Sequence, residues 1–216
     1  MSKETPVDVI APTRSSARAH ILECAKRLFA ERGFNGTSIS DIAGASGVSK
    51  ANIFHHFESK EGLYLATIAA IVERGKDLVG PTDAQGRDVV AFFQDLAVAE
   101  QRRAAEDPEG LLLTLREILS GDPKRSRVLA KDIFAENFNR LVELIRHEQE
   151  SGRLRADVDP ALAATLLRSA NVFYWMGREV LRHMPGVDFA EDGETYARRT
   201  TEILLQGLLA RHGAEG

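Results

Sequence analysis

The hydrophobic positions of this chain recur every three to four residues along most of its length, which is the spacing of amphipathic helices. A first helix is expected from Ser15 or Ser16, which can cap its start, to Gly33, which can end it in a left-handed conformation. Its inner face would be formed by Ile21, Leu22, Ala25, Leu28 and Phe29. The later part of the chain has no convincing period-two alternation of the kind that predicts a strand. The expected fold class is therefore all-α.

Polar capping residues and glycines divide the next stretch into three shorter helical patterns. The expected caps and breaks are Ser38 or Ser40, the turn at Gly47, Ser49 before a helix over 50–56, Ser59, and Gly80 and Pro81 after Val79. The positions expected to face inward are Ile39, Ile42, Ala43, Val48, Ile53 and Phe57. Helices this short need packing against the first helix to be stable. Residues 38–57 therefore have the layout of a helix-turn-helix that reads duplex DNA.

Residues 80–87 have the composition of a linker, and five further helical patterns follow them. Their expected spans are 87–106, 108–121, 123–152, 160–184 and 194–212. Proline opens three of these patterns, where no intrahelical N–H bond is needed. We expect about nine helices in three parts: a flexible arm (1–14), a three-helix DNA-binding unit (15–75) and a C-terminal bundle (76–216).

The distribution of charge favours a nucleic-acid partner although the net charge does not. The 216-residue chain has a formal net charge of −4. Residues 14–60, however, carry seven lysines and arginines against four acidic residues, which gives this part a net charge of +3. The predicted helix-turn-helix therefore lies in the part of the chain that can approach a polyphosphate.

The overall composition is that of a globular protein, with 44% hydrophobic and 28% charged residues. No apolar run approaches the roughly 20 residues that a membrane span needs, and the first residues do not have the pattern of a secretory signal. We therefore expect a cytoplasmic protein without membrane contact. The single cysteine, Cys24, lies in the first helical pattern and is expected to be a small buried side chain.

The start of the helix predicted over 50–56 is the end that would enter the major groove. There Lys50 can reach a phosphate or a guanine edge, Asn52 can pair with adenine, and the Ala51 methyl can touch a thymine methyl. Further candidates lie at helix starts or along the same backbone path: Thr37, Ser38, Ser49, His55 and Lys60. Arg14 and Arg18 could form a minor-groove or phosphate arm, or a disordered basic end.

In these motifs, residues 18–65 resemble the DNA-binding domain of the TetR family of bacterial repressors. The matching motifs are A-x-x-L-F-A-E-R-G-F at 25–34, T-S-I-S-D-I-A at 37–43, G-V-S-K at 47–50 and F-H-H-F-x-S-K-E-x-L at 54–63. The resemblance implies a homodimeric repressor that leaves a palindromic operator when a small molecule binds its C-terminal domain. It also implies DNA contacts by Thr37, Ser49, Asn52, His55 and Lys60. Phe54 departs from the pattern, because the family usually has a tyrosine there whose hydroxyl can meet a phosphate.

Within the C-terminal part of the chain, most of the aromatic side chains are clustered at three places: 92–93, 134–138 and 173–175. Core and dimer packing must explain most of them, but the four consecutive bulky residues at 173–176 cannot all face one side of a helix. A mostly apolar cavity with a few polar groups is the alternative, and it would bind an apolar or aromatic effector. Its candidate lining residues are Phe93, Phe134, Asn137, Phe138, Asn171, Tyr174, Trp175 and Arg178.

The last two predicted helices carry apolar stripes that can form a dimer surface. The stripe residues are Leu162, Leu166, Phe173 and Gly177 on one helix and Ile203, Leu204, Gly207 and Leu208 on the other. Two such helices from each subunit would form a four-helix bundle with two-fold symmetry. Packing of both stripes inside one subunit is the alternative.

The sequence therefore predicts a ligand-responsive DNA-binding regulator, most simply a repressor. A regulator controlled by a protein partner, or an activator, remains open. An enzyme is not expected, because no nucleophile–base set, phosphate-binding loop or metal cluster is present in the sequence. No cofactor is expected, and neither is a metal, since His55 and His56 on one helix would point about 100° apart.

Overall fold

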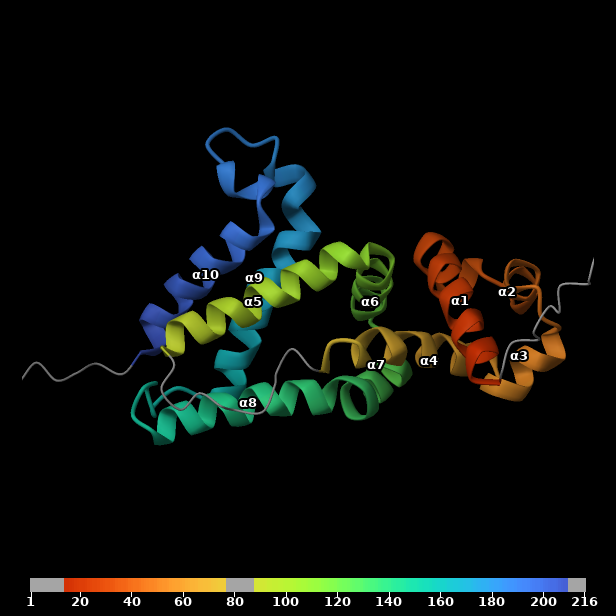
Figure 1. Ribbon diagram of the computed structural model, residues 1–216, viewed down its shortest axis with the longest axis horizontal. Coiled ribbons are helices and arrows are strands. Elements are labelled where there is room, and N and C mark those ends of the chain that lie inside the picture. Colours follow the sequence, from red (N-terminus) through yellow and green to blue (C-terminus); the bar gives the residue numbers. More distant parts are fainter. Residues whose placement is uncertain (1–13, 77–87, 210–216) are drawn as a thin grey trace, which may run out of the picture.

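The computed structural model describes residues 14–76 and 88–209, and within them the chain is built of helices (Figure 1). The elements are α1 (Arg14–Gly36), α2 (Ile39–Ser46), α3 (Lys50–Phe57), α4 (Lys60–Glu73), α5 (Val89–Glu106), α6 (Pro108–Ser120), α7 (Pro123–Val128), a π-helical segment η2 (Leu129–Phe134), α8 (Ala135–Glu150), α9 (Pro160–Leu181), a short 3-10 helix η3 (Asp188–Glu191) and α10 (Gly193–Leu208). These described residues contain no strand, only an isolated antiparallel bridge between Leu154 and Leu209. The all-α prediction is confirmed.

Helix boundaries differ from the expected ones in several places. The first helix, expected to end at Gly33, continues to Gly36, although Gly33 itself has a non-helical backbone with a positive φ of 71°. The helix expected over 123–152 is divided by the π-helical segment η2, and α7, η2 and α8 follow one another without a break. If this run is counted as one helix and the single 3-10 turn is left out, the described residues hold the expected nine. The fourth helix ends at Glu73 and not near Val79, because the turn after it begins with a hydrogen bond from the Gly75 amide to the Val72 carbonyl. Residues 1–13 of the predicted arm (1–14), the linker over 80–87 and the end of the last helix beyond Leu209 lie outside the described residues.

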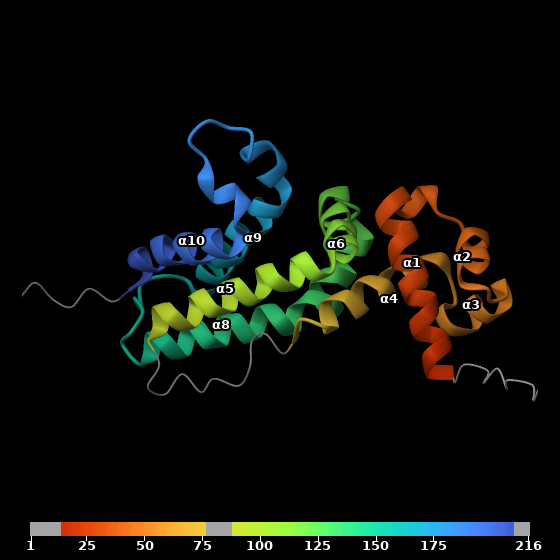
Figure 2. The same cartoon turned by 45° about the horizontal axis from the view of Figure 1, so that its top comes forward.

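Helices α1 to α3 form a head at one end of the molecule, and α4 runs from this head into the C-terminal helices (Figures 1 and 2). Most of the expected inner residues of the head are buried, with Ile21, Phe29, Ile42 and Ile53 fully covered. Ile39, Ala43 and Val48 are only partly buried and pack against this core. Phe29 also meets the ring of Tyr64 on α4 edge to face, with 4.8 Å between ring centroids. The short helices α2 and α3 are therefore held by tertiary packing, as their length requires.

The core of the head continues into the C-terminal helices. Leu113 of α6 and Leu129 of η2 are buried in the same apolar cluster as the residues of α1, α3 and α4. Each loses its exposure to water against the head, so both stabilise the head through the hydrophobic effect. The boundary between two domains near residue 75 stays a prediction. Residues on both sides of that boundary pack in one apolar cluster.

The C-terminal helices α5, α8, α9 and α10 surround a second core. Its most deeply buried members are Leu144, Ile145, Ala163, Ala164 and Leu205. Two alanines in succession on α9 permit close approach of the neighbouring helices, as small residues do at helix contacts. None of the helices in the described part of the chain is long and apolar enough to cross a membrane.

Candidate DNA-binding surface and internal cavity

The first turn of α3 presents three side chains away from the core of the head. Ile53 and Phe57 fix this orientation, because both are buried against α1. Lys50 and Ala51 are exposed, and Asn52 is half-buried. The hydroxyl of Ser49 caps this helix by accepting a hydrogen bond from the Asn52 amide at 3.2 Å. A short helix with an exposed polar N-terminal turn is the geometry of a recognition helix entering a major groove.

Thr37 and Ser38, two predicted DNA contacts at the start of α2, differ in their exposure to solvent. Ser38 is exposed and is the N-cap, and its hydroxyl and amide both pair with the Asp41 carboxylate, which lowers the pKa of Asp41. Thr37 is only 1% exposed, and its hydroxyl donates to the carbonyls of Leu28 and Gly33. The expectation that the Thr37 side chain contacts DNA therefore does not fit its position, because the hydroxyl is buried and already paired.

Two cations beside α3 are held over aromatic rings. The Arg18 guanidinium lies 5.2 Å from the centroid of the Phe57 ring, and the Lys60 ammonium lies 4.4 Å from that of Phe34. Such contacts fix the side chains by cation–π attraction and leave their remaining donors free for phosphate. Arg14 opens α1, and its side chain lies outside the described residues.

The outer side of α3 also exposes His55 and the ring of Phe54, which is 45% exposed. Phe54 therefore lies on the surface, where a tyrosine hydroxyl would reach solvent or a phosphate. His55 contacts His56 edge to face, with ring centroids 5.5 Å apart. Across the described ranges, no three His, Cys, Asp or Glu residues are grouped so that they could hold a metal ion.

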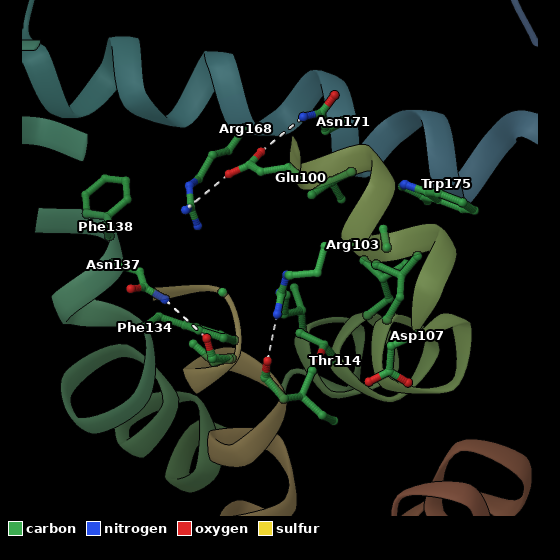
Figure 3. Close-up of a pocket in the computed structure, with 18 of the residues that line it drawn as sticks. Glu100, Arg103, Asp107, Thr114, Phe134, Asn137, Phe138, Arg168, Asn171 and Trp175 are labelled. Atoms are coloured by element: carbon green, nitrogen blue, oxygen red, sulfur yellow. Dashed lines mark hydrogen bonds and ion pairs between the residues drawn. The ribbon is translucent and has the colours of Figure 1, made fainter. Parts of the chain in front are cut away.

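A cavity of about 590 Å³ lies between the end of α4 and helices α5, α6, α8 and α9 (Figure 3). This volume is within the usual range for small-molecule sites. Five of the eight predicted lining residues do line it: Phe134, Asn137, Phe138, Asn171 and Trp175. Phe134 comes from η2, and a π-helical turn at a cavity wall is a common feature of functional sites.

The other three predicted lining residues lie elsewhere. Phe93 is 2% exposed and belongs to the second core. The Tyr174 hydroxyl donates to the Ala190 carbonyl at 3.1 Å, and its ring packs against Tyr196. The Arg178 guanidinium lies 4.3 Å from the ring of Trp175, and Arg178 is exposed. Helical spacing placed these side chains on α5 and α9 but could not say which of them reach the cavity.

Glu100 of α5 and Arg168 of α9, which the sequence analysis did not single out, also line the cavity. Glu100 accepts a hydrogen bond from Asn171 at 3.0 Å and lies 3.3 Å from the guanidinium of Arg168. Asn171 also accepts a hydrogen bond from Gln101 at 3.0 Å. Lone charges on amphipathic helices usually face water, so only the tertiary structure identifies these as inward-facing.

Two cavity residues bind the last carbonyls of α4. Arg103 donates to the Ile71 carbonyl at 2.8 Å, and Asn137 donates to the Val72 carbonyl at 3.5 Å. These side chains satisfy acceptors that a helix end leaves free. Burial lowers the pKa of Arg103 from its ordinary value, although a guanidinium remains charged in proteins.

Four buried polar atoms in or beside the cavity have no hydrogen-bond partner within the described structure: Asn137 Oδ1, Gln101 Oε1, Arg168 Nε and Trp175 Nε1. Buried polar groups are otherwise nearly always paired. Three of these atoms belong to lining residues, so the cavity wall has unused donors and an unused acceptor. It can therefore bind a molecule that is mostly apolar but carries polar groups.

The outer side of α9 and α10 exposes an apolar surface. Leu162, Leu166, Phe173 and Ile203 are 55%, 42%, 59% and 67% exposed, respectively. Gly207 is also exposed, and Gly177 and Leu204 are half-buried. Leu208, in contrast, is 8% exposed and belongs to the second core, so its placement on a dimer surface needs correction. Apolar side chains exposed together on neighbouring helices can mark a protein contact.

Comparisons with known proteins find relatives over most of this chain. The family model described as "Bacterial regulatory proteins, tetR family" matches residues 21–67. The chain is 30% identical over 203 residues to the HTH-type transcriptional regulator RutR of Escherichia coli K12, covering 91% of this chain and 92% of that protein. It is 27% identical over 210 residues to the HTH-type transcriptional repressor KstR2 of Rhodococcus jostii RHA1, covering 92% and 94%. The solved structure of Salmonella enterica GusR is 28% identical, with a TM-score of 0.71 over 89% of this chain and 95% of that one.

Proposed function

The chain belongs to the TetR family of bacterial regulatory proteins, and we propose that it is a homodimeric repressor released from a palindromic operator by a small molecule in its cavity. Like its relatives, the chain is a DNA-binding transcriptional regulator and not an enzyme. Repression is proposed because the relative KstR2 carries the name of a repressor. Operator binding would make the cytoplasm its place of action.

The observation that carries the proposal is the position of α4. This helix begins at Lys60, directly after α3, and its last turn contributes Ile71 and Val72 to the cavity wall. A ligand that fits better when α4 is displaced therefore has differential affinity for two positions of the head. Such a ligand shifts the population away from the DNA-binding arrangement.

On DNA, we propose that Lys50, Ala51 and Asn52 contact base edges and that the residues around them contact phosphates. The proposed phosphate contacts are Arg14, Arg18, Ser38, Ser49, His55 and Lys60. Two copies of α3 would enter successive major grooves of one face of the duplex, so the spacing of the half-sites must match the two-fold axis of the dimer.

The dimer is proposed to form through the exposed apolar side chains of α9 and α10. Both helices would pack against the same pair of a second copy, which makes the contact self-complementary. This arrangement would cover Leu162, Leu166, Phe173 and Ile203, which water reaches in the single chain.

A gel-shift titration with the DNA upstream of the protein's own gene tests the proposal. At low salt, the DNA must shift with a whole number of dimers bound to each fragment. Light scattering must give the mass of a dimer for the free protein. A folded dimer that binds none of these fragments above the level of random DNA would defeat the operator hypothesis. Increased transcription from the bound promoter would show an activator instead.

A further inference from the structure

We propose that the cavity binds an amphipathic monocarboxylate, whose carboxylate takes the Arg103 guanidinium away from the Ile71 carbonyl and so releases the end of α4. This inference deepens the proposed function and rests on it. It specifies the charge of the effector, the residue that binds this charge and the contact that binding would break.

The body of the ligand must be apolar because most of the wall is apolar. Side chains that line the cavity include Leu111, Leu115, Ile118, Phe134, Phe138 and Val172. They come from α6, η2, α8 and α9, and none of them offers a hydrogen bond. A ligand that fills this part of the cavity gains by removing apolar surface from water.

The charge of the ligand can be inferred from the charged side chains that line the cavity, because some of them are already paired and others are not. The lining contains two carboxylates, Glu100 and Asp107, and two guanidiniums, Arg103 and Arg168. Glu100 is paired with Arg168 and Asn171. Asp107 is paired with Lys26 at 2.7 Å and accepts a hydrogen bond from the Gly110 amide at 3.0 Å. A cationic ligand would therefore find both carboxylates occupied.

Arg103 is different, because its only hydrogen-bond acceptor in the described structure is the Ile71 carbonyl. No carboxylate there lies within ion-pair distance of its guanidinium. A guanidinium has five N–H donors in a planar fork that matches a carboxylate and binds it through two parallel hydrogen bonds. The unpaired Nε of Arg168 adds a further donor on the same wall (Figure 3). The unused cationic donors of the wall can thus bind one anion.

The geometry also connects this anion to α4. The Arg103 side chain extends from α5 to the end of α4, as Figure 3 shows. Gly75 permits the approach, since a Cβ there would lie only 2.7 Å from the Arg103 Cζ. A carboxylate in the cavity competes with the neutral Ile71 carbonyl for this guanidinium, and charge-assisted hydrogen bonds are the stronger kind. Binding would therefore free the last turn of α4, which leads back to α3.

The single tryptophan provides the measurement, because Trp175 lines the cavity. Its fluorescence is titrated in the full-length protein with decanoate and 6-phenylhexanoate, and with the primary amide and the primary amine of the same carbon skeletons. We expect each carboxylate to bind at least tenfold more tightly than its amide, and the amine to bind no better than the amide. Equal or tighter binding of the amides or amines would overturn the inference, and so would failure of all six compounds to bind at millimolar concentration.

Two matched variants test the role of Arg103. R103Q should lose the preference for carboxylate over amide and still bind the amide as wild type does, which also shows that its cavity is intact. R102Q is the control, because Arg102 is the exposed neighbour that pairs with Glu194 on the other side of α5. It should keep the full preference. A carboxylate preference that survives in R103Q would place the anion elsewhere and refute the assignment.

A gel shift on the operator fragment separates this inference from the proposed function. The carboxylates should release the DNA from wild type and R102Q but not from R103Q, and the amides should release it at no more than a tenth of the efficiency. If the protein binds operator DNA but shows no carboxylate preference, only this inference fails. If the fluorescence preference holds and no upstream fragment is bound, the operator hypothesis fails and the ligand class stands.

Discussion

The ammonium of Lys26 lies 2.7 Å from the carboxylate of Asp107, so a partly buried ion pair joins α1 of the head to the N-cap of α6. Lys26 is only 6% exposed and also pairs with Glu23 at 2.8 Å. In the sequence, Lys26 contributed to the positive charge of the DNA-binding part. In the structure, Lys26 binds the head to the C-terminal helices through this ion pair.

Removal of this ion pair should destabilise the whole molecule. Lys26→Met leaves the partly buried Asp107 carboxylate with Arg74, at 3.7 Å, as its remaining cation. Loss of a charged hydrogen-bond partner at such a position costs about 2 kcal/mol, and urea unfolding measures it. Lys124→Met is the matched control, since Lys124 pairs with Glu61 but its side chain is 78% exposed. It should cost less than about 1 kcal/mol, and equal losses in both variants would contradict the assignment.

The same pair predicts a response to acid. Burial opposes ionisation of Asp107, but the hydrogen bonds from Lys26 and the Gly110 amide outweigh it, so the pKa of Asp107 is below its ordinary value of 3.8. A carboxylate with a lowered pKa stabilises the fold above its unfolded-state pKa, and this contribution disappears as the pH falls through the lower folded-state pKa. Stability should therefore fall below pH 3.8 in wild type. Lys26→Met should show a shallower fall over the same interval in urea unfolding at pH 6 to 2.5.

Base contacts and phosphate contacts should be separable by salt. Lys50→Ala combined with Asn52→Ala should abolish the preference for operator over random DNA and leave the dimer intact. Lys60→Ala should weaken binding to both DNAs alike and reduce the slope of log K against log salt by about 0.9, the value for one phosphate contact. Fluorescence anisotropy at several salt concentrations gives both quantities. Unchanged operator preference in the double variant would mean that the reading head lies elsewhere.

Phe54 offers a prediction of gained affinity. The ring is 45% exposed on the outer side of α3, so Phe54→Tyr adds a hydroxyl without changing the core. A new hydrogen bond to a charged phosphate should contribute about 1.5 kcal/mol, roughly a tenfold increase in affinity for any duplex. The salt slope should stay unchanged, because tyrosine adds no charge. Fluorescence anisotropy with operator and random DNA measures the affinity. If the affinity for neither DNA increases, the side chain at position 54 does not lie beside a phosphate.

The dimer surface can be tested by placing a charge within it. Phe173→Asp or Ile203→Asp should convert the dimer to a monomer, because an unpaired carboxylate would have to be buried. Leu119→Asp is the control, since Leu119 of α6 is 66% exposed, about as much as Ile203, but lies off the α9–α10 surface. Sedimentation velocity should show a dimer only for the control. A dimer in all three variants would mean that α9 and α10 do not form the contact.

Local signals in the sequence were sufficient to predict much of the head. Ser38, Ser49 and Ser59 each cap a helix, and Gly47 has the left-handed conformation expected of a turn. Caps depend on neighbours within three residues, so they can be recognised without tertiary information. The same signals gave the starts of α6, α7 and α9, where an aspartate is followed by proline.

Contacts across the chain could not be predicted in this way. The wall of the cavity depends on Glu100 and Arg103 of α5 and Arg168 of α9, which meet only in the folded protein. Each is a polar residue on an amphipathic helix, and its sequence neighbours do not indicate that it points inward. Thr37 is a similar case. Its hydroxyl is buried because it donates to the carbonyls of Leu28 and Gly33, and the folded structure was needed to show this.

The apolar cluster that Leu113 and Leu129 share with the head affects how regulators of this architecture can be recombined. A chimera joined after α4, with the C-terminal helices of another protein, would place foreign side chains against Ile21, Phe29 and Ile68. A mismatch of even one methylene in such a core is destabilising. The exchangeable reading unit is thus residues 14–76 together with the inward faces of α6 and η2, and a graft that carries these faces should retain both folding and specificity.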